Sequence, residues 1–359
     1  MILVTGGTGF VGREVVRELL ALGYTVRLLA RDPKKAVRLG RWPSVEIVAG
    51  DALKPDTLPA AVAGVDAVIH LIGIIAETAR VSFEQAHVEA THNVLAAAKQ
   101  AGVTRWIQMS AAGTRPHAVS RYHITKWEAE ELVRRSGLDW TIFRPSLIYG
   151  YDERDRFLNL LRLAVAGPAL PLLDDGLARV QPVSVRDVAR SFALAVASNA
   201  SLGRVFDLVG PEPLSWREMI LKVARARGRD VIYEDFPILP FLRAFLWLAI
   251  AFLPVAVIVG LWLGRLSLPG AEIVVLAEVG LILVVNRWRQ LIVFNVPAGQ
   301  VLLLALGWDA IMPRAFRFGE QLKMAVEDNV GDPRPAAETL GYAPESFESG
   351  LNRLFVTKR

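Results

Sequence analysis

Apolar and polar positions follow a regular order over residues 1–150. Short apolar runs, typical of buried strands, alternate with longer stretches in which apolar residues recur every three or four positions, as in amphipathic helices. The predicted strands span residues 1–4, 24–30, 45–49, 65–70, 103–109 and 138–143, and the predicted helices span residues 11–22, 57–63, 83–101 and 122–136. This order predicts an α/β domain over residues 1–150 that is built on a doubly wound parallel sheet.

The pattern becomes more mixed over residues 151–237. Helices are predicted near residues 155–166 and 186–197, with a turn near residue 175 between them. We interpret this region as a smaller second lobe that is interleaved with the first domain and holds a substrate.

A long apolar region, residues 238–312, follows the second lobe. Residues 244–264 are 21 positions without a charge, which is enough helix to cross a hydrocarbon core about 30 Å thick. Residues 266–286 are apolar apart from Glu272 and Glu278, and tryptophans stand near the segment ends. We expect a helical, membrane-associated segment, either a two-span hairpin or helices that lie in the headgroup layer. A helical hairpin buried in protein is the alternative.

Composition changes this picture mainly by exclusion. The 359 residues are 53% hydrophobic and 21% charged, and the net charge of +5 comes without a run of five basic residues, so we expect no nucleic-acid partner. The chain has no cysteine, which excludes disulfides, thiolate catalysis and thiolate-bound metals. Its five histidines are scattered, and His87 and His92 miss the spacing that puts two ligands on one helix face. We therefore expect no metal site.

A glycine-rich loop joins the first predicted strand to the first predicted helix. Its sequence is Thr5-Gly6-Gly7-Thr8-Gly9-Phe10-Val11-Gly12. Backbone amides and the helix dipole favour an anion at such a helix start. Gly6 permits a tight turn, Gly9 lets the backbone approach a pyrophosphate, and Gly12 lets the helix pack closely against the strand. We expect a dinucleotide to contact Gly6, Thr8, Gly9, Phe10, Val11 and Gly12. A tightly packed turn without a ligand is the alternative.

Arg31 follows the second predicted strand, where the adenosine ribose of a dinucleotide is read. An arginine at this place suits a 2′-phosphate, whereas a carboxylate would accept from a 2′-hydroxyl. The sequence therefore favours NADPH over NADH. Asp32 is the next residue, and a shift of one position would favour NADH instead. Arg31 as a plain surface cation is the remaining alternative.

Tyr122 and Lys126 stand four residues apart in a predicted helix, so they share one face. An ammonium beside a phenol favours the phenolate, and we expect this pairing to lower the pKa of Tyr122 toward neutral pH. Tyr122 could then exchange a proton with a carbonyl or hydroxyl group, while Lys126 holds ribose hydroxyls. An ordinary surface pair is the alternative.

These motifs together resemble the extended and atypical short-chain dehydrogenase/reductases, over residues 1 to about 235 and again near the carboxyl terminus. The residues that carry the resemblance are Thr5 to Gly12, Gly50-Asp51, Asn93, Ser110, Tyr122 with Lys126, and residues 143–150, 181–189 and 206–212. Residues 136–146, 320–324 and 328–330 are most similar to the branch that includes the NADPH-binding accessory subunit of respiratory complex I.

The resemblance implies a Rossmann sheet, NADP as cofactor, Asp51 and Lys126 as further cofactor contacts, and catalysis by a tyrosine, a lysine and a serine or threonine. The third member is in doubt, because Ala111 and Ala112 follow Ser110. Ser110 or Thr114 would have to take its place. Losing one placed hydroxyl can cost about 10²-fold in rate.

The resemblance also implies that residues 313–359 form a tail that packs on the two lobes, which requires an even number of membrane crossings. The amino terminus shows no leader pattern, so we expect the lobes at the cytoplasmic face of a membrane, anchored by residues 238–312. Two functions fit. One is a membrane-attached NADPH-dependent reductase or dehydrogenase of a hydrophobic substrate, and the other is a non-catalytic NADPH-binding subunit of a membrane respiratory complex.

Overall fold

The computed structural model describes residues 1–34, 36, 44–150, 156–167, 169–234, 290–296, 299, 301, 305, 309 and 319–356. The chain divides into two compact units, each built from separate stretches of sequence. The first unit contains Met1–Asp155, Ala178–Leu214 and Gly299–Gly350, and the second contains Arg156–Leu177, Ser215–Ala298 and Leu351–Arg359. The predicted lobe of residues 151–237 is therefore shared between the two units.

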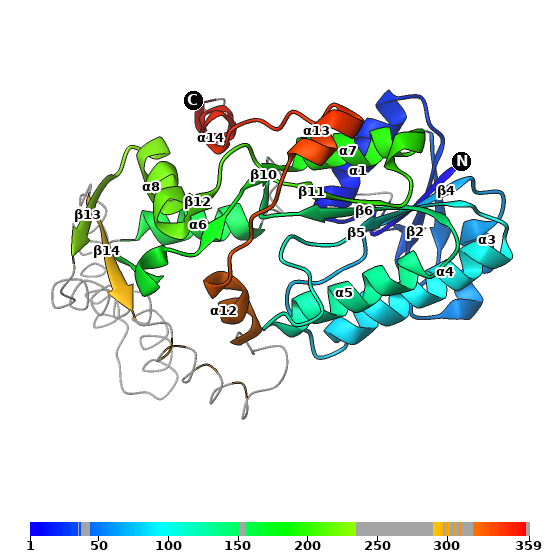
Figure 1. Ribbon diagram of the computed structural model, residues 1–359, viewed down its shortest axis with the longest axis horizontal. Helices are drawn as coiled ribbons and strands as arrows, with labels where there is room; N and C mark the ends of the chain where they lie inside the picture. The colour runs from blue at the N-terminus through cyan, green and yellow to red at the C-terminus, as the bar shows by residue number, and fades with distance from the viewer. Residues whose placement is uncertain are drawn as a thin grey trace, which may run out of the picture. The chain divides into compact units, whose positions relative to one another are not determined.

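The first unit is built on a sheet of seven parallel strands in the order β11-β6-β5-β4-β1-β2-β3 (Figure 1). The strands are β1 (Ile2–Thr5), β2 (Val26–Ala30), β3 (Val45–Ala49), β4 (Ala67–His70), β5 (Arg105–Met109), β6 (Asp139–Pro145) and β11 (Arg204–Leu208). In the register of the central strand, Ile2 of β1 lies opposite Val26 of β2 and Ala67 of β4. The predicted parallel α/β sheet is thus confirmed. The seventh strand, β11, comes from beyond the region for which strands were predicted.

Helices cover both faces of this sheet, because successive strand residues point to opposite sides. On one face, α1 (Phe10–Ala21), α7 (Val185–Ala195) and α13 (Arg334–Leu340) pack over a core that includes Val4. On the other face, α3 (Pro59–Val62), α4 (Ala90–Gln100) and α5 (Arg121–Arg134) pack over a core that includes the neighbouring Leu3. Figure 1 shows these two helical layers on either side of the sheet.

Strand order determines where a ligand can bind. Strands β1 and β4 are neighbours, yet the chain leaves β1 toward β2 and returns to β4 only after β3. In open parallel sheets, ligands bind outside the carboxyl ends of the strands at such a reversal. The loops after β1 and β4 meet there, since a Cβ added at Gly6 would lie 3.0 Å from the carbonyl carbon of Leu71.

Residues 319–350 belong to the first unit and contact it along several loops. They contain α12 (Gly319–Val326), α13 and the start of α14 (Phe347–Val356). The Asn329 N–H donates to the Arg179 carbonyl at 2.7 Å, and the Tyr342 hydroxyl donates to the Val209 carbonyl at 2.8 Å. These bonds join distant parts of the sequence within one unit.

The second unit contains a three-stranded parallel sheet in the order β13-β14-β8. Its strands are β8 (Ala169–Leu173), β13 (Asp230–Glu234) and β14 (Gln290–Val296), and its helices are α6 (Arg156–Ala166) and α8 (Trp216–Ala226). Shorter elements elsewhere in the chain are η1 (Pro55–Thr57), η2 (Glu84–Glu89), β7 (Ile148–Tyr149), η3 (Asp174–Gly176), β9 (Arg179–Val180), β10 (Val183–Ser184), η4 (Asn199–Ser201) and β12 (Leu214–Ser215).

Strand β14 corrects one boundary of the apolar region. We predicted residues 238–312 as a helical, membrane-associated segment, yet residues 290–296 form the central strand of the second unit's sheet. The run Leu291-Ile292-Val293-Phe294 consists of β-branched, branched and aromatic residues, which favour a pleated, buried surface. The two predicted spans, residues 244–264 and 266–286, lie outside the described residues. No helix among the described residues combines the length and the apolar character needed to cross a bilayer.

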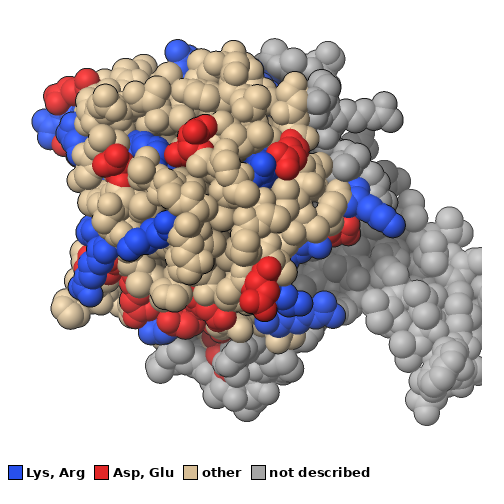
Figure 2. Space-filling view, turned by 90° about the vertical axis from the view of Figure 1, so that its right-hand side faces the viewer, with Lys and Arg blue, Asp and Glu red and all other residues tan. Residues whose placement is uncertain are grey.

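Both signs of charge occur on the face shown in Figure 2. Basic and acidic side chains are interspersed there, with uncharged surface between them. Neighbouring strands of the first unit also pair opposite charges, as where Arg27 of β2 contacts Glu46 of β3 at 2.9 Å. The described residues on this face therefore form no continuous basic surface.

Candidate functional site

The glycine loop turns sharply out of β1 into α1. Gly6 has a φ of +73°, a left-handed conformation that costs a residue with a Cβ roughly 1–2 kcal/mol. The Gly9 N–H donates to the Gly6 carbonyl at 2.9 Å, which closes the turn. The role predicted for Gly6 is thus visible in the backbone.

Two further glycines are required by close packing. A Cβ at Gly12 would collide with the Gly6 carbonyl oxygen and the Gly7 Cα, both of which belong to the backbone of the loop itself. A Cβ at Gly7 would lie 2.5 Å from the Leu28 side chain of β2. We predicted that Gly12 packs closely against the strand, but a Cβ there would meet backbone atoms of the loop instead. The close packing at Gly7 was not predicted.

The start of α1 presents donors for an anion. Gly9 is the N-cap residue, it is exposed, and no side chain caps the helix there. The first turn contains no acidic residue that would compete with a bound anion. Because the first N–H groups of a helix have no partner within the helix, this end can bind phosphate oxygens. Among the predicted contacts, Thr8 is partly buried at this turn, whereas Val11 is 9% exposed and packs in the core, so only its backbone can reach a ligand.

Arg31 and Asp51 lie at the carboxyl ends of neighbouring strands. Arg31 is exposed just after β2, beside the exposed Asp32. Asp51 follows β3 and accepts the Leu53 N–H at 3.1 Å through Oδ1, while its own N–H donates to Thr57 Oγ1 at 2.9 Å. Asp51 therefore shapes the loop after β3 in addition to any role toward a ligand.

Lys126 is brought to the reversal of strand order by α5. The side chain is 3% exposed, and Nζ donates to the Met109 carbonyl at 3.2 Å, at the end of β5. A Cβ added at Gly73, in the loop after β4, would lie 2.9 Å from the same Nζ. Burial lowers the pKa of Lys126 to about 8, partly opposed by Glu130, so the ammonium form still predominates at neutral pH.

Tyr122 departs from the prediction. Burial raises its pKa to about 12, and the expected lowering by the Lys126 ammonium is wrong. Its ring lies between aromatic side chains, with centroid separations of 5.9 Å to Phe83, 5.4 Å to His87 and 5.1 Å to His123. Loss of water around the phenol is the cause of the raised pKa, and the Lys126 Nζ donates to the Met109 carbonyl instead. Tyr122 is consequently protonated at neutral pH.

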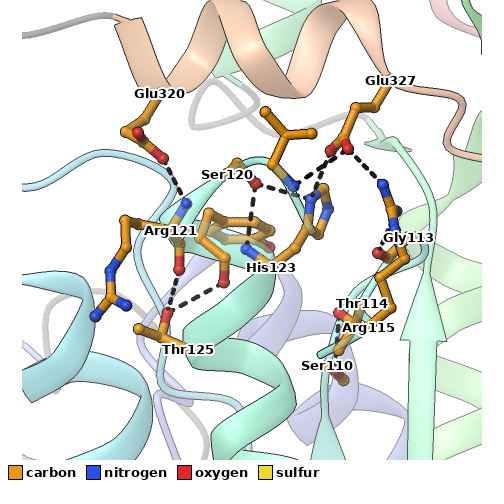
Figure 3. A network of polar contacts seen from close by, with 12 residues as sticks. Ser110, Gly113, Thr114, Arg115, Ser120, Arg121, His123, Thr125, Glu320 and Glu327 are labelled. Carbon is orange, nitrogen blue, oxygen red and sulfur yellow. Dashed lines mark hydrogen bonds and ion pairs between the residues drawn. The ribbon is translucent and has the colours of Figure 1, made fainter. Parts of the chain in front are cut away.

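Ser110 lies at the end of β5, and its hydroxyl donates to Thr114 Oγ1 at 3.3 Å (Figure 3). Both side chains are buried, at 2% and 3% exposure. Ala111 and Ala112, the residues that put the third catalytic member in doubt, are also buried and supply no hydroxyl. Ser110 and Thr114, the two hydroxyl residues that the sequence offered as the third catalytic member, are therefore hydrogen-bonded to each other.

Two buried histidines, His70 and His87, lie near Lys126. His70 ends β4; its Nδ1 lies 2.9 Å from Thr5 Oγ1, and burial lowers its pKa to about 3. His87 lies in the π-helix η2, where its Nδ1 is 2.8 Å from Thr125 Oγ1 and its Nε2 is 3.1 Å from the Ile74 carbonyl. Burial also lowers the pKa of His87, so both rings are neutral near Lys126.

His87 could hardly be recognised as a site residue from the sequence. It falls inside a predicted helix, and only tertiary packing puts it between Ile74 and α5. Its π-helical backbone is a sign of function, since π-helical turns are frequent at functional sites. The spacing of apolar residues does not reveal such a turn. No group of three metal-binding side chains is found among the described residues.

Comparisons with known proteins agree with this geometry. Residues 6–160 match the model of the NAD(P)H-binding family. The NAD(P)H azoreductase of Xenophilus azovorans is 31% identical over 235 residues, which are 65% of this chain and 76% of the azoreductase. Subunit 9 of the NADH dehydrogenase [ubiquinone] 1 alpha subcomplex, from Arabidopsis thaliana mitochondria, is 34% identical over 223 residues, 60% of this chain and 55% of that subunit.

A solved structure extends the likeness in fold. The NADPH-dependent quinone oxidoreductase of Escherichia coli, complexed with NADPH, matches with a TM-score of 0.67 and 15% identity, over 99% of this chain and 100% of that one. With the sheet order, the glycine loop and the Tyr122–Lys126 pair, these likenesses confirm the predicted family. The chain belongs to the NAD(P)H-binding family and is a reductase-like member of the short-chain dehydrogenase/reductases.

Proposed function

We propose that this protein is an NADPH-dependent reductase of a hydrophobic carbonyl or quinone-like substrate. The observation that carries the proposal is the position of Lys126 Nζ, beside Gly73 and the Met109 carbonyl. Those atoms border the reversal of strand order, where the glycine loop also ends. The carboxyl ends of the central strands thus carry both the glycine loop and a buried cation, and Tyr122 lies on the same helix as that cation.

The residues present fit the cofactor. Gly6 and Gly12 let the backbone pack where any Cβ would collide with it, and the uncapped start of α1 supplies donors for the pyrophosphate. Arg31 would hold the 2′-phosphate, Asp51 would border the adenosine, and Lys126 would hold ribose hydroxyls. NADPH supplies a hydride to the substrate when it is bound.

Tyr122 sets the direction of the proposed chemistry. Because burial keeps the phenol protonated at neutral pH, Tyr122 would be the proton donor, which suits a reduction in which NADPH gives a hydride to the carbonyl carbon and Tyr122 gives a proton to the oxygen. The paired hydroxyls of Ser110 and Thr114 would donate one further hydrogen bond to that oxygen. Similarity to reductases, an azoreductase among them, supports this direction.

Turnover by the purified full-length protein tests the proposal. Oxidation of NADPH is followed with lipophilic ketone, quinone and azo probes, first for the unmodified protein and then for Tyr122→Phe. We expect Tyr122→Phe to lower kcat by about 10²–10⁴-fold while NADPH affinity is kept. Tyr24→Phe, a partly buried tyrosine outside the site, is the matched control. Equal rates for Tyr122→Phe and the unmodified protein would contradict the assigned role.

A second candidate function rests on Ala111 and Ala112 and on the 34% identity to the complex I subunit. In that role the protein would hold NADPH without oxidising it and would dock on other subunits of a membrane complex. Tightly retained NADPH that no probe oxidises, together with co-purifying partner subunits, favours this alternative. Turnover that depends on Tyr122 excludes it.

We also propose that residues 244–286 attach the protein to the cytoplasmic face of a membrane. The support is the uncharged stretch of 21 residues and the flanking tryptophans, none of which lie in the described residues.

Because the chain has no cysteine, Arg265→Cys introduces a single reactive thiol. A two-span hairpin predicts labelling by a membrane-impermeant maleimide from outside intact cells, and interfacial helices predict labelling only after lysis. Lys99→Cys, on the exposed side of α4, should be labelled only after lysis. Recovery of all protein in the soluble fraction would contradict attachment.

A further inference from the structure

The loop of residues 110–120 links β5 to α5 and forms one side of the proposed reductase site. It begins with Ser110, whose hydroxyl contacts Thr114, and ends with Ser120, the N-cap residue of α5. Tyr122 follows in the first turn of α5. Any movement of this loop therefore changes the position of both the candidate hydroxyls and the proton donor.

Glu327, just beyond α12, holds this loop from outside (Figure 3). One of its oxygens, Oε1, accepts from the Arg115 guanidinium and from the Val119 N–H, the latter at 3.4 Å. Arg115 in turn donates to the Gly113 carbonyl at 2.9 Å. The Glu327 side chain is only 11% exposed, so water screens these contacts weakly.

The other oxygen of Glu327 faces the start of α5. Oε2 lies 3.5 Å from Nδ1 of His123 and has no hydrogen-bond partner among the described residues. The Ser120 hydroxyl occupies that nitrogen at 2.9 Å, and the His123 ring also bonds the Ala112 backbone. Burial lowers the pKa of His123, whereas Glu327 raises it and Arg115 lowers it. Glu327 thus acts electrostatically on the residue next to Tyr122.

The preceding helix adds contacts to the same region. Glu320 of α12 accepts the Arg121 N–H at 2.6 Å, at the first residue of α5. Gln321 donates through Nε2 to the Ile75 carbonyl at 2.9 Å, in the loop after β4 that contains Gly73. Both loops that border Lys126 are therefore bound by residues 320–327.

We propose that Glu327 is a positioning residue for the reductase site: it fixes the loop of residues 110–120 and the start of α5, so that Tyr122 meets the substrate oxygen. This inference rests on the proposed function. A carboxylate suits the task because it accepts from Arg115 and from the Val119 amide and its charge raises the pKa of His123, whereas an alanine does none of these. Misplacement of a reacting group by about 1 Å can cost 10²-fold in rate.

Three variants of the full-length protein test the proposal. Glu327→Ala removes all the contacts, and Glu327→Gln keeps an acceptor oxygen but removes the charge. Asp332→Asn is the matched control, because Asp332 lies in the same segment, has a side chain that is 43% exposed and pairs only with Arg334 among the ion pairs of the described residues. We expect kcat to fall by about 10²-fold in Glu327→Ala, by less in Glu327→Gln and not at all in Asp332→Asn, with NADPH affinity within about twofold throughout.

Two readouts do not require turnover. Hydrogen exchange at the Val119 amide should accelerate in Glu327→Ala, since that amide loses its acceptor. In an NMR titration, the pKa of His123 should fall in Glu327→Gln, because the carboxylate raises it. If the unmodified protein shows no turnover while both readouts change, the proposed function fails and the assigned control of the loop stands. Unchanged kcat, exchange and His123 titration in the Glu327 variants would overturn the inference.

Discussion

The two ends of the candidate site are built in different ways. The phosphate end consists of eight consecutive residues, Thr5 to Gly12, and works through backbone amides and the absence of Cβ atoms. The reducing end combines side chains from α5, the ends of β4 and β5, the π-helix η2 and the segment after α12. We therefore expect one added side-chain atom to disable phosphate binding by the glycine loop. At the reducing end, we expect activity to fall in steps as single contacts are removed.

Adding a side chain to the glycine loop should produce the largest effect. Gly12→Val drives methyl groups into the Gly6 carbonyl and the Gly7 backbone, so the loop must open. Two lost charge-assisted amide contacts of about 1.5–3 kcal/mol each correspond to roughly 100-fold weaker NADPH binding or more. Calorimetric titration measures this change.

Gly23→Ala separates affinity from stability. Gly23 ends α1 with a φ of +81° and has no neighbour within 4 Å of an added Cβ, so alanine there should cost about 1 kcal/mol of folding free energy. NADPH affinity should stay unchanged. If Gly12→Val binds as tightly as Gly23→Ala, the loop is not the phosphate site.

Lys126, at the reducing end of the site, should make the free energy of unfolding depend on pH. Burial lowers its pKa from 10.5 to about 8, so the unfolded chain binds more protons between these values and folding stability rises with pH there. A fall in pKa from 10.5 to about 8 corresponds to roughly 3 kcal/mol of folding free energy. Denaturant unfolding from pH 7 to 10 should show this rise in the unmodified protein and lose it in Lys126→Met. Lys99→Met, which replaces an exposed lysine of α4, should retain it; loss of the rise in both variants would point to another group.

Arg31 should have the most selective effect on binding, confined to one cofactor. Arg31→Ala removes one charge-assisted contact to a 2′-phosphate, worth about 1.5–3 kcal/mol, or roughly 10- to 100-fold in NADPH affinity. NADH affinity should not change, because NADH has no 2′-phosphate. Arg17→Ala, at an exposed position of α1, is the control. Equal losses for NADPH and NADH in Arg31→Ala would remove Arg31 from the ribose site.

The phosphate end of the site could be predicted from the sequence, whereas most of the reducing end could not. Strands β1 to β6 and the roles of Gly6 and Gly12 depend on local spacing and on steric rules that act within a few residues. The sequence could place Lys126 on the same helix face as Tyr122. It could not predict the surroundings of the Tyr122 phenol, because these depend on Phe83 and His87 from another element. The raised pKa of Tyr122 is a consequence of that packing.

Longer-range contacts explain the other failures. Glu327 lies more than 200 residues from Arg115, and nothing in the local sequence links the two. Strand β14 sits in an apolar region whose composition suits a helix or a strand equally, and its pairing with β13 and β8 decides between them. The predicted spans at residues 244–286 are still a prediction.

Binding of NADPH to the purified protein tests the central claim most directly. Titration followed by nicotinamide fluorescence should show one saturable site with a dissociation constant in the range of about 1 μM, near −8 kcal/mol, and weaker binding of NADH. Gly12→Val should show no saturation over the same range. Absence of binding by either nucleotide to the folded, unmodified protein would contradict the account.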